Sequence, residues 1–195
     1  MTAGDEAGPG RSHGDRGPGR DTAKPTVTVI VDGANVVGSR PDGWWRDRAG
    51  AAVRLHDELA KLAARGAAGI PAEQLATGDG DQPSGPPGAA PDPSGLLTAG
   101  VVRVRVVLVL EGAARAAAPR IAERARATDA GRTQEGDAGT VQVVSAPGSG
   151  DDEIVRLAWA CAGRCIVVTA DRELRRRSLA AGARVAGPSW LYASL

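Results

Sequence analysis

Residues 26–35 read TVTVIVDGAN, a run of β-branched residues that ends in a carboxylate. The first six residues show no helical period, which is typical of a strand buried on both faces of a sheet. The apolar run stops at Asp32 and Gly33. We therefore predict a buried first strand over 26–31, followed directly by an acidic side chain.

Helix and strand patterns alternate along the rest of the chain. Apolar residues recur at helical spacing over 46–65, where Gly66 is the expected stop, and over 113–127, 151–162 and 171–181. Further strands are predicted at 101–110, 140–145, 165–169 and 184–186. Such alternation implies right-handed crossovers, so we predict an α/β fold with a mainly parallel sheet of about five strands, covered by helices on both faces.

Composition divides the chain into a folded part and two polar segments. The 195 residues include 27 glycines and 13 prolines, which concentrate before Thr26 and between Gly66 and Gly100. Segments of this composition bury too little apolar surface to offset the entropy of ordering. We predict a disordered tail over 1–24 and a single domain over 25–195, interrupted by a flexible insertion at about 66–100.

Charge and residue usage exclude several functional classes. The net charge is +1, so any attraction to nucleic acid must come from a local patch. The only histidines are His13 and His56, which leaves little basis for catalysis by a histidine base. Neither a signal peptide nor a membrane-spanning run is visible, and we expect a cytoplasmic protein.

Acidic residues follow the predicted strands one after another. They are Asp32 after the first strand, Glu111 after the second, Asp151 and Asp152 after the third, and Asp171 after the fourth. Because parallel strands end at the same edge of a sheet, we expect these carboxylates to converge there. Converging anions repel each other unless a cation lies among them. Oxygen ligands without His or Cys favour Mg²⁺ or Mn²⁺.

Helical phase separates the two neighbouring aspartates. Asp151 lies three residues before Ile154, on the apolar stripe of its helix, and is the preferred ligand. Asp152 is the flanking support, and a capping box with Ser149 is its other explanation. Asp171 also opens a helix, where a carboxylate serves as an N-cap. Asn35 is expected to orient Asp32, bind a metal-bound water or contact a phosphate, and as the alternative it is a turn residue.

Two adjacent tryptophans stand at the mouth of the predicted site. The chain has four Trp, one Tyr and no Phe, and Trp44 and Trp45 are followed by Arg46 and Arg48. Nucleobases stack on exposed indoles beside guanidinium groups, so we expect contact with single-stranded RNA from Arg40, Trp44, Trp45, Arg46, Arg48 and Arg172. Packing of a tryptophan over the following helix, and a solvated face for the arginines, are the alternatives.

Three motifs carry a resemblance to a known family. They are VDGANVV at 31–37, GSGDDEIVRLA at 148–158 and CIVVTADRELRRRSLAAGARV at 165–185. The chain resembles the PIN-like nucleases of the NYN class, particularly the YacP-like branch and its actinobacterial relatives with a GSRPDGWW loop. The resemblance covers roughly 26–62 and 101–187.

The resemblance implies a metal-dependent endoribonuclease with a three-layer α/β/α fold. Asp32, Asn35, Asp151 and Asp171 match the family's motif positions, whereas relatives often have Asp where this chain has Glu111. We expect one or two Mg²⁺ or Mn²⁺ ions, held by Asp32, Asp151 and Asp171, to activate water for attack on an RNA phosphodiester. The products would then carry 5′-phosphate and 3′-hydroxyl ends.

The same residues argue against several other functions. A haloacid-dehalogenase phosphatase needs a second Asp where this chain has Ala34, and neither GxxxxGK[ST] nor GxGxxG is present. The remaining alternative is a non-catalytic RNA-binding or ribosome-associated adaptor that retains the fold.

Overall fold

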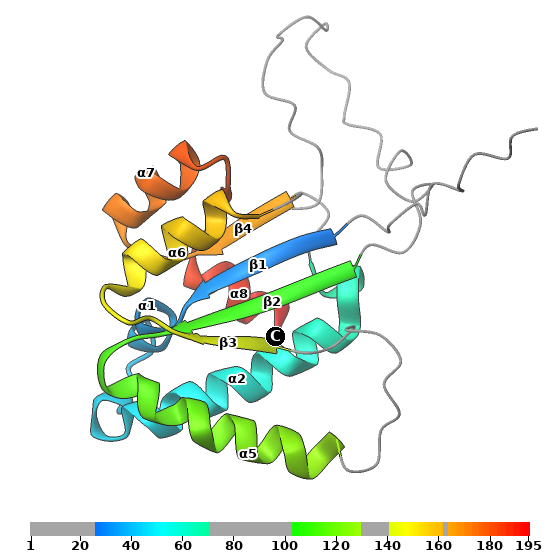
Figure 1. Ribbon diagram of the computed structural model, residues 1–195, viewed down its shortest axis with the longest axis vertical. Coiled ribbons are helices and arrows are strands. Elements are labelled where there is room, and N and C mark those ends of the chain that lie inside the picture. Colours follow the sequence, from blue (N-terminus) through cyan, green and yellow to red (C-terminus); the bar gives the residue numbers. More distant parts are fainter. Residues whose placement is uncertain (1–25, 71–102, 130–140, 162–163) are drawn as a thin grey trace, which may run out of the picture.

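The computed structural model describes residues 26–70, 103–129, 141–161 and 164–195 (Figure 1). Within these residues, five strands form one parallel sheet in the order β3-β2-β1-β4-β5. The strands are β1 (Thr26–Asp32), β2 (Arg103–Leu110), β3 (Val141–Ser145), β4 (Arg164–Val168) and β5 (Arg184–Ala186).

Helices connect the strands and cover the sheet. The α-helices are α1 (Gly33–Gly38), α2 (Arg48–Arg65), α5 (Ala117–Asp129), α6 (Gly150–Trp159), α7 (Arg172–Ala180) and α8 (Pro188–Ser194). Three short 3₁₀ helices are η1 (Trp44–Arg46), η2 (Gly66–Gly69) and η3 (Gly112–Ala116). No helix in the described ranges is long and apolar enough to cross a membrane.

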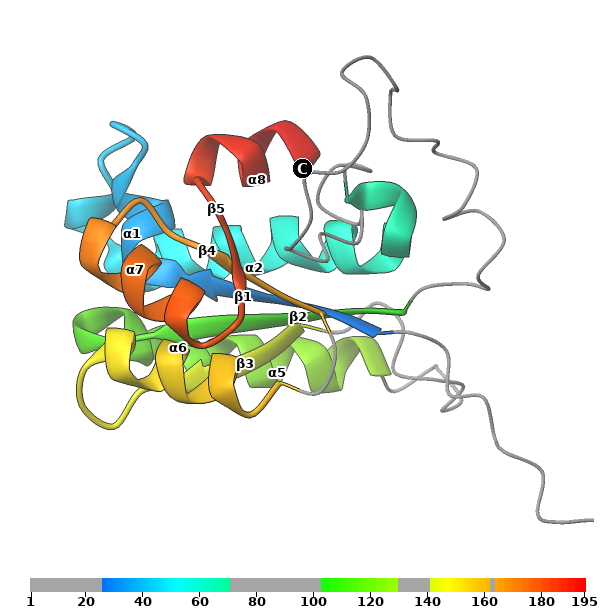
Figure 2. The same ribbon diagram turned by 90° about the horizontal axis from the view of Figure 1, so that it is seen from above.

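Alternation along β1 divides the core into two halves. Val29 and Val31 face Leu59 and Leu62 of α2, in a core half that also contains Leu191 of α8. On the opposite side of the sheet, the strand residues Ile30, Val107 and Val167 share a second cluster with Ile154 of α6 and Leu174 of α7. Figure 2 shows α2 and α8 on one side of the sheet and α6 on the other. The predicted three-layer α/β/α fold is therefore confirmed.

The order of the strands fixes where a site can form. From β1 the chain proceeds through β2 to β3 on one side, and it then crosses to β4 and β5 on the other. Val31 pairs with Val168, and Asp32 lies level with Val109, so the neighbouring strands end close to the same level. The carboxyl ends of β1 and β4 thus flank the point where the winding reverses, which is where open α/β sheets bind ligands.

The structure corrects several predicted boundaries. The helix predicted over 46–65 begins at Arg48, because Asp47 caps it by accepting a hydrogen bond from the Gly50 amide. Gly66, at φ 58°, ends it as expected. The helix predicted over 113–127 is divided into η3 and α5, and the helix over 151–162 ends at Trp159.

Two helices of the structure, α1 and α8, were not predicted from the sequence. α1 has six residues and α8 has seven, so neither is long enough to show a helical period. At the start of the predicted insertion, η2 spans Gly66–Gly69 and Ile70 is buried in the core. The tail predicted over 1–24 and residues 71–100 of the predicted insertion lie outside the described residues.

Candidate functional site

Asp32 lies at the centre of the carboxyl edge of the sheet. It is the last residue of β1, and only 7% of it is exposed. One carboxylate oxygen accepts a hydrogen bond from the Asn35 amide at 3.0 Å and thereby caps α1. The other oxygen accepts a hydrogen bond from the Thr169 hydroxyl at 2.9 Å. The side chain is therefore fixed by both elements that flank the switch point.

The pKa of Asp32 is raised above its ordinary value. Burial is the main cause, and the charges of Asp151 and Glu111 raise the pKa further. The hydrogen bonds from Asn35 and Thr169 act in the opposite direction. A buried acid is thus held next to two more acids, which is unfavourable for a purely structural arrangement.

Thr169 is a site residue that the sequence reasoning missed. It follows β4, is fully buried, and its hydroxyl both donates to Asp32 and accepts from the Asp171 amide at 3.1 Å. A hydroxyl side chain directly after the apolar run of β4 mirrors the position of Asp32 after β1. The position of Thr169, a polar residue at the end of a buried strand, is the sequence signal that could have identified it as a site residue.

Asp171 combines a capping role with membership of the acidic group. One of its oxygens accepts a hydrogen bond from the Leu174 amide at 2.7 Å, so the predicted N-cap of α7 is present. Its charge also raises the pKa of Asp151. The cap leaves the second oxygen of Asp171 available to another partner.

Glu111 links the end of β2 to the start of α6. One of its oxygens accepts a hydrogen bond from the Gly150 amide at 2.8 Å. A Cβ at position 150 would lie only 2.6 Å from that oxygen, so a larger residue there would force the Glu111 carboxylate to shift. The charge of Glu111 raises the pKa of both Asp32 and Asp151. The longer side chain at this position is therefore accommodated by the small residue opposite it.

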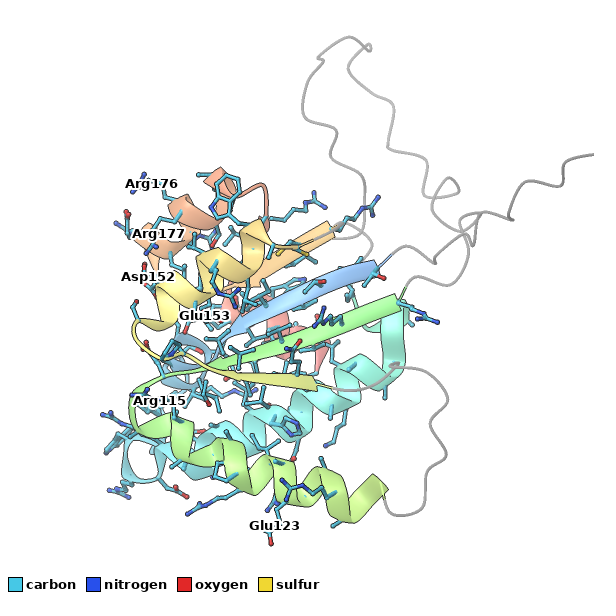
Figure 3. The ribbon with its side chains drawn as sticks, in the orientation of Figure 1. Arg115, Glu123, Asp152, Glu153, Arg176 and Arg177 are labelled. Atoms are coloured by element: carbon cyan, nitrogen blue, oxygen red, sulfur yellow. The ribbon has the colours of Figure 1, made fainter. Side chains whose placement is uncertain are left out.

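Asp151 and Asp152 are placed differently, as helical phase predicts. The pKa of Asp151 is raised by partial burial and then by Asp171 and Glu111, while Arg177 lowers it. The Asp152 side chain is 70% exposed and forms an ion pair with Arg177 at 2.6 Å (Figure 3). Its amide donates to the Ser149 hydroxyl at 3.5 Å. We call Asp32, Glu111, Asp151 and Asp171 the carboxylate cluster, and Asp152 lies at its margin.

Asn35 joins the two sides of the switch point. Its side-chain oxygen accepts a hydrogen bond from the Ala170 amide at 2.9 Å, and its backbone amide donates to Asp32. The contact to Asp32 thus comes from the backbone of Asn35, while its side chain joins α1 to the residue that follows Thr169.

The donors of the carboxylate cluster fit a hard divalent cation in their chemistry. They are oxygen atoms only, and their negative charges act on one another: Glu111 raises the pKa of both Asp32 and Asp151, and Asp171 raises that of Asp151. Across the described ranges, however, no three His, Cys, Asp or Glu side chains are arranged as a ready-made metal site. A cation would therefore have to draw the carboxylates into coordination.

All but one of the predicted RNA-binding residues fall into two groups. Trp45 is 54% exposed, Arg46 lies 6.0 Å from its ring centre, and Arg48 lies 5.5 Å from that of Trp44. Arg40 is engaged elsewhere: it stacks on Tyr192 of α8 at 3.3 Å and pairs with Glu58 at 3.7 Å.

Arg172 belongs to neither group. It is an exposed residue at the start of α7, next to the capping Asp171.

Cavity size does not identify the site. A cavity of about 690 Å³ lies between α2 and α5, where Asp57 and Arg124 pair at 3.1 Å. No member of the carboxylate cluster lines it. We assign the site by its chemistry and by its place at the switch point.

Known proteins resemble this chain in structure at low sequence identity. No family model and no curated protein matches the sequence. A solved structure of Rae1 (YacP) from Bacillus subtilis, in a tryptophan-to-leucine mutant, is similar with a TM-score of 0.42 and 16% identity. The match covers 85% of this chain and 72% of that chain.

Proposed function

We propose that this protein is a metal-dependent ribonuclease that hydrolyses phosphodiester bonds of single-stranded RNA. The observation that carries the proposal is Asp32, a buried acid at the switch point whose pKa is raised by burial and by two further acids. Such a cluster costs stability in the absence of a cation, and cations held by carboxylates are suited to phosphodiester hydrolysis.

Each residue of the site has a defined task in this proposal. Asp32, Asp151 and Asp171 would hold Mg²⁺ or Mn²⁺, which supplies a water of lowered pKa and a positive charge for the leaving oxygen. Thr169 and Asn35 keep the Asp32 carboxylate in place through their hydrogen bonds. They are positioning residues, because neither is required to contact the substrate.

Glu111 and Arg115 shape the other side of the site. Glu111 fixes the start of α6, and with it Asp151, through the Gly150 amide. Arg115 donates hydrogen bonds to the carbonyl oxygens of Gly112 and Ala146, and so ties η3 to the end of β3. Figure 3 shows Arg115 near the ends of β2 and β3. These contacts hold the loops around the carboxylate cluster.

Single-stranded RNA is the substrate that the surrounding side chains favour. With a net charge of +1, binding depends on local groups, and Trp44, Trp45, Arg46 and Arg48 supply indoles and guanidinium groups together. Unstacked bases stack on aromatic rings, whereas bases in a duplex are not free to do so.

A second candidate is a non-catalytic RNA-binding or ribosome-associated adaptor with the same fold. It is favoured by the hydrogen bonds that Asp32, Asp171 and Glu111 already make to backbone amides, which give these acids structural roles. The two candidates differ in whether a divalent cation and RNA cleavage depend on Asp32.

The test is cleavage of an end-labelled single-stranded RNA in Mn²⁺, in Mg²⁺ and in EDTA. Wild type should cut only with a divalent ion, Asp32→Asn should abolish cutting, and Asp57→Asn should cut like wild type because Asp57 lies on α2 beside Arg124. The products should carry 5′-phosphate and 3′-hydroxyl ends. A 2′,3′-cyclic phosphate would overturn the metal mechanism, and RNA binding without cutting would favour the adaptor.

A further inference from the structure

A second, smaller cavity borders the carboxylate cluster. It has a volume of about 180 Å³ and lies where α1, η1, α2 and η3 meet. Gly33, Ala34, Ala113, Trp44, Arg48 and Glu111 line it. Because Glu111 belongs both to this lining and to the carboxylate cluster, a group held in the cavity is adjacent to the proposed reaction site.

The lining suits a flat aromatic ligand. Small glycine and alanine residues make up part of the lining, while Trp44 contributes an indole and Arg48 a guanidinium group 5.5 Å from that ring. Pockets for drug-sized ligands begin at about 300 Å³, so this cavity suits a smaller group. One nucleobase is a flat ring system of that smaller class, and it stacks on indoles with cation–π support from arginine.

The two neighbouring indoles differ in their surroundings. The Trp44 and Trp45 rings meet edge to face, with centroids 6.3 Å apart and planes at 86°. Trp44 lines the cavity and is half-buried, whereas Trp45 is not part of the lining and is 54% exposed. One indole is therefore held as a cavity wall, and the other is a surface side chain.

We propose that this cavity, the Trp44 pocket, takes one unstacked base of a single-stranded RNA whose adjacent phosphate reaches the carboxylate cluster. This inference rests on the proposed function for the identity of the ligand. It goes beyond that function by assigning the base contact to Trp44 and Arg48 and by placing it next to Glu111.

The test removes one base from the RNA and one indole from the protein. A short single-stranded RNA is compared with versions carrying one abasic residue at each position, and affinity is measured by fluorescence anisotropy in EDTA, where no cutting occurs. For wild type, one abasic position should weaken binding by roughly five- to a hundredfold, the range expected for loss of one stacked base.

Variants of the tryptophans make the assignment specific. Trp44→Ala should weaken binding of intact RNA by a similar factor and should no longer respond to the abasic position. Trp44→Phe, which keeps an aromatic wall, should retain most of the response. The control variant Trp159→Ala should keep the full response, because Trp159 is a 67% exposed tryptophan at the end of α6, outside the pocket. Circular dichroism checks that each variant is folded.

The outcomes separate the pocket from the nuclease proposal. An abasic penalty that is unchanged in Trp44→Ala, or RNA binding with no sensitive position, overturns the Trp44 pocket even if the protein cuts RNA with Mn²⁺. A penalty that disappears in Trp44→Ala supports the pocket even if no RNA is cut, in which case catalysis is the part that fails.

Discussion

At position 32, one side chain is a helix cap, a hydrogen-bond acceptor for a buried hydroxyl and a member of an acidic group. These tasks place opposite demands on its charge. The hydrogen bonds from Asn35 and Thr169 favour the carboxylate, whereas burial and the neighbouring acids favour the neutral acid, and the net effect raises the pKa. Residues under such conflicting demands are characteristic of functional sites.

Asp32→Asn should therefore stabilise the protein in EDTA. A carboxyl whose pKa is raised in the folded state contributes stability below its unfolded pKa, and this contribution is lost as the pH rises through the folded value. Asn is neutral throughout and still caps α1, since Asn and Asp are equivalent N-caps. Urea unfolding at pH 7 should show a higher free energy of unfolding than wild type, with the difference shrinking toward pH 4. A less stable variant at pH 7 would contradict this reading.

Gly150→Ala tests the contact between α6 and Glu111. The new Cβ would lie 2.6 Å from the Glu111 oxygen, so the carboxylate must move away, and we expect to lose about 0.5–1.5 kcal/mol in the free energy of unfolding, the typical contribution of one hydrogen bond. Gly148→Ala is the matched control, because nothing lies within 4 Å of a Cβ built there.

Shortening the acid should relieve the clash. In the double variant Gly150→Ala with Glu111→Asp, the two losses should not add, as is typical of residues in contact. Additive losses would show that Glu111 is not the group that excludes a side chain at position 150.

At the scale of elements, α6 and α7 meet beside the carboxylate cluster through a charged contact. Arg177 of α7 pairs with Asp152 of α6 and also lowers the pKa of Asp151. Arg177 thus places a positive charge where a divalent cation would bind. Arg176, one residue earlier, pairs instead with Glu173 on its own helix.

Arg177→Met should strengthen cation binding rather than weaken it. Removing the positive charge leaves Asp151 less compensated and frees Asp152, and both changes favour a divalent ion. The loss in stability should stay below about 1 kcal/mol, because the pair is largely exposed. Calorimetric titration with Mn²⁺ should give a lower Kd than wild type, and Arg176→Met should leave the Kd unchanged. Weaker Mn²⁺ binding in Arg177→Met would refute this role.

The elements were predictable where their patterns were long. The apolar run before Asp32 identified β1, and the spacing of Leu55, Leu59 and Leu62 identified α2, because both patterns reflect burial. α1 and α8 are instead determined by the residues at which they begin. α1 is a short turn of helix begun by the Asp32 cap, and α8 starts at Pro188, a favoured first residue. Local caps of this kind carry little periodic signal.

At the scale of the whole molecule, the parallel sheet gathers residues that are remote in the sequence. That the acids after successive strands share one edge followed from parallel pairing alone. The strand order did not, because alternation of helices and strands leaves the direction of winding open. The missing order explains why Thr169 was overlooked, since its meeting with Asp32 depends on β4 lying beside β1.

Divalent ions should stabilise the whole fold if the carboxylate cluster binds them. A ligand bound only by the native state adds about 2.7 kcal/mol at a concentration a hundredfold above its Kd. Thermal unfolding of wild type should therefore shift upward with Mn²⁺, and the shift should vanish in Asp32→Asn. Asp57→Asn serves as the control and should keep it. An equal shift in Asp32→Asn would place the ion elsewhere.

The hydrogen bond between Thr169 and Asp32 spans 137 positions of the chain. During synthesis β1 emerges long before β4, so the Asp32 carboxylate lacks the Thr169 hydroxyl until the chain has been made as far as the end of β4. The growing chain therefore carries only half of the site. Whatever activity resides there begins only after β4 has been made and has joined the sheet beside β1.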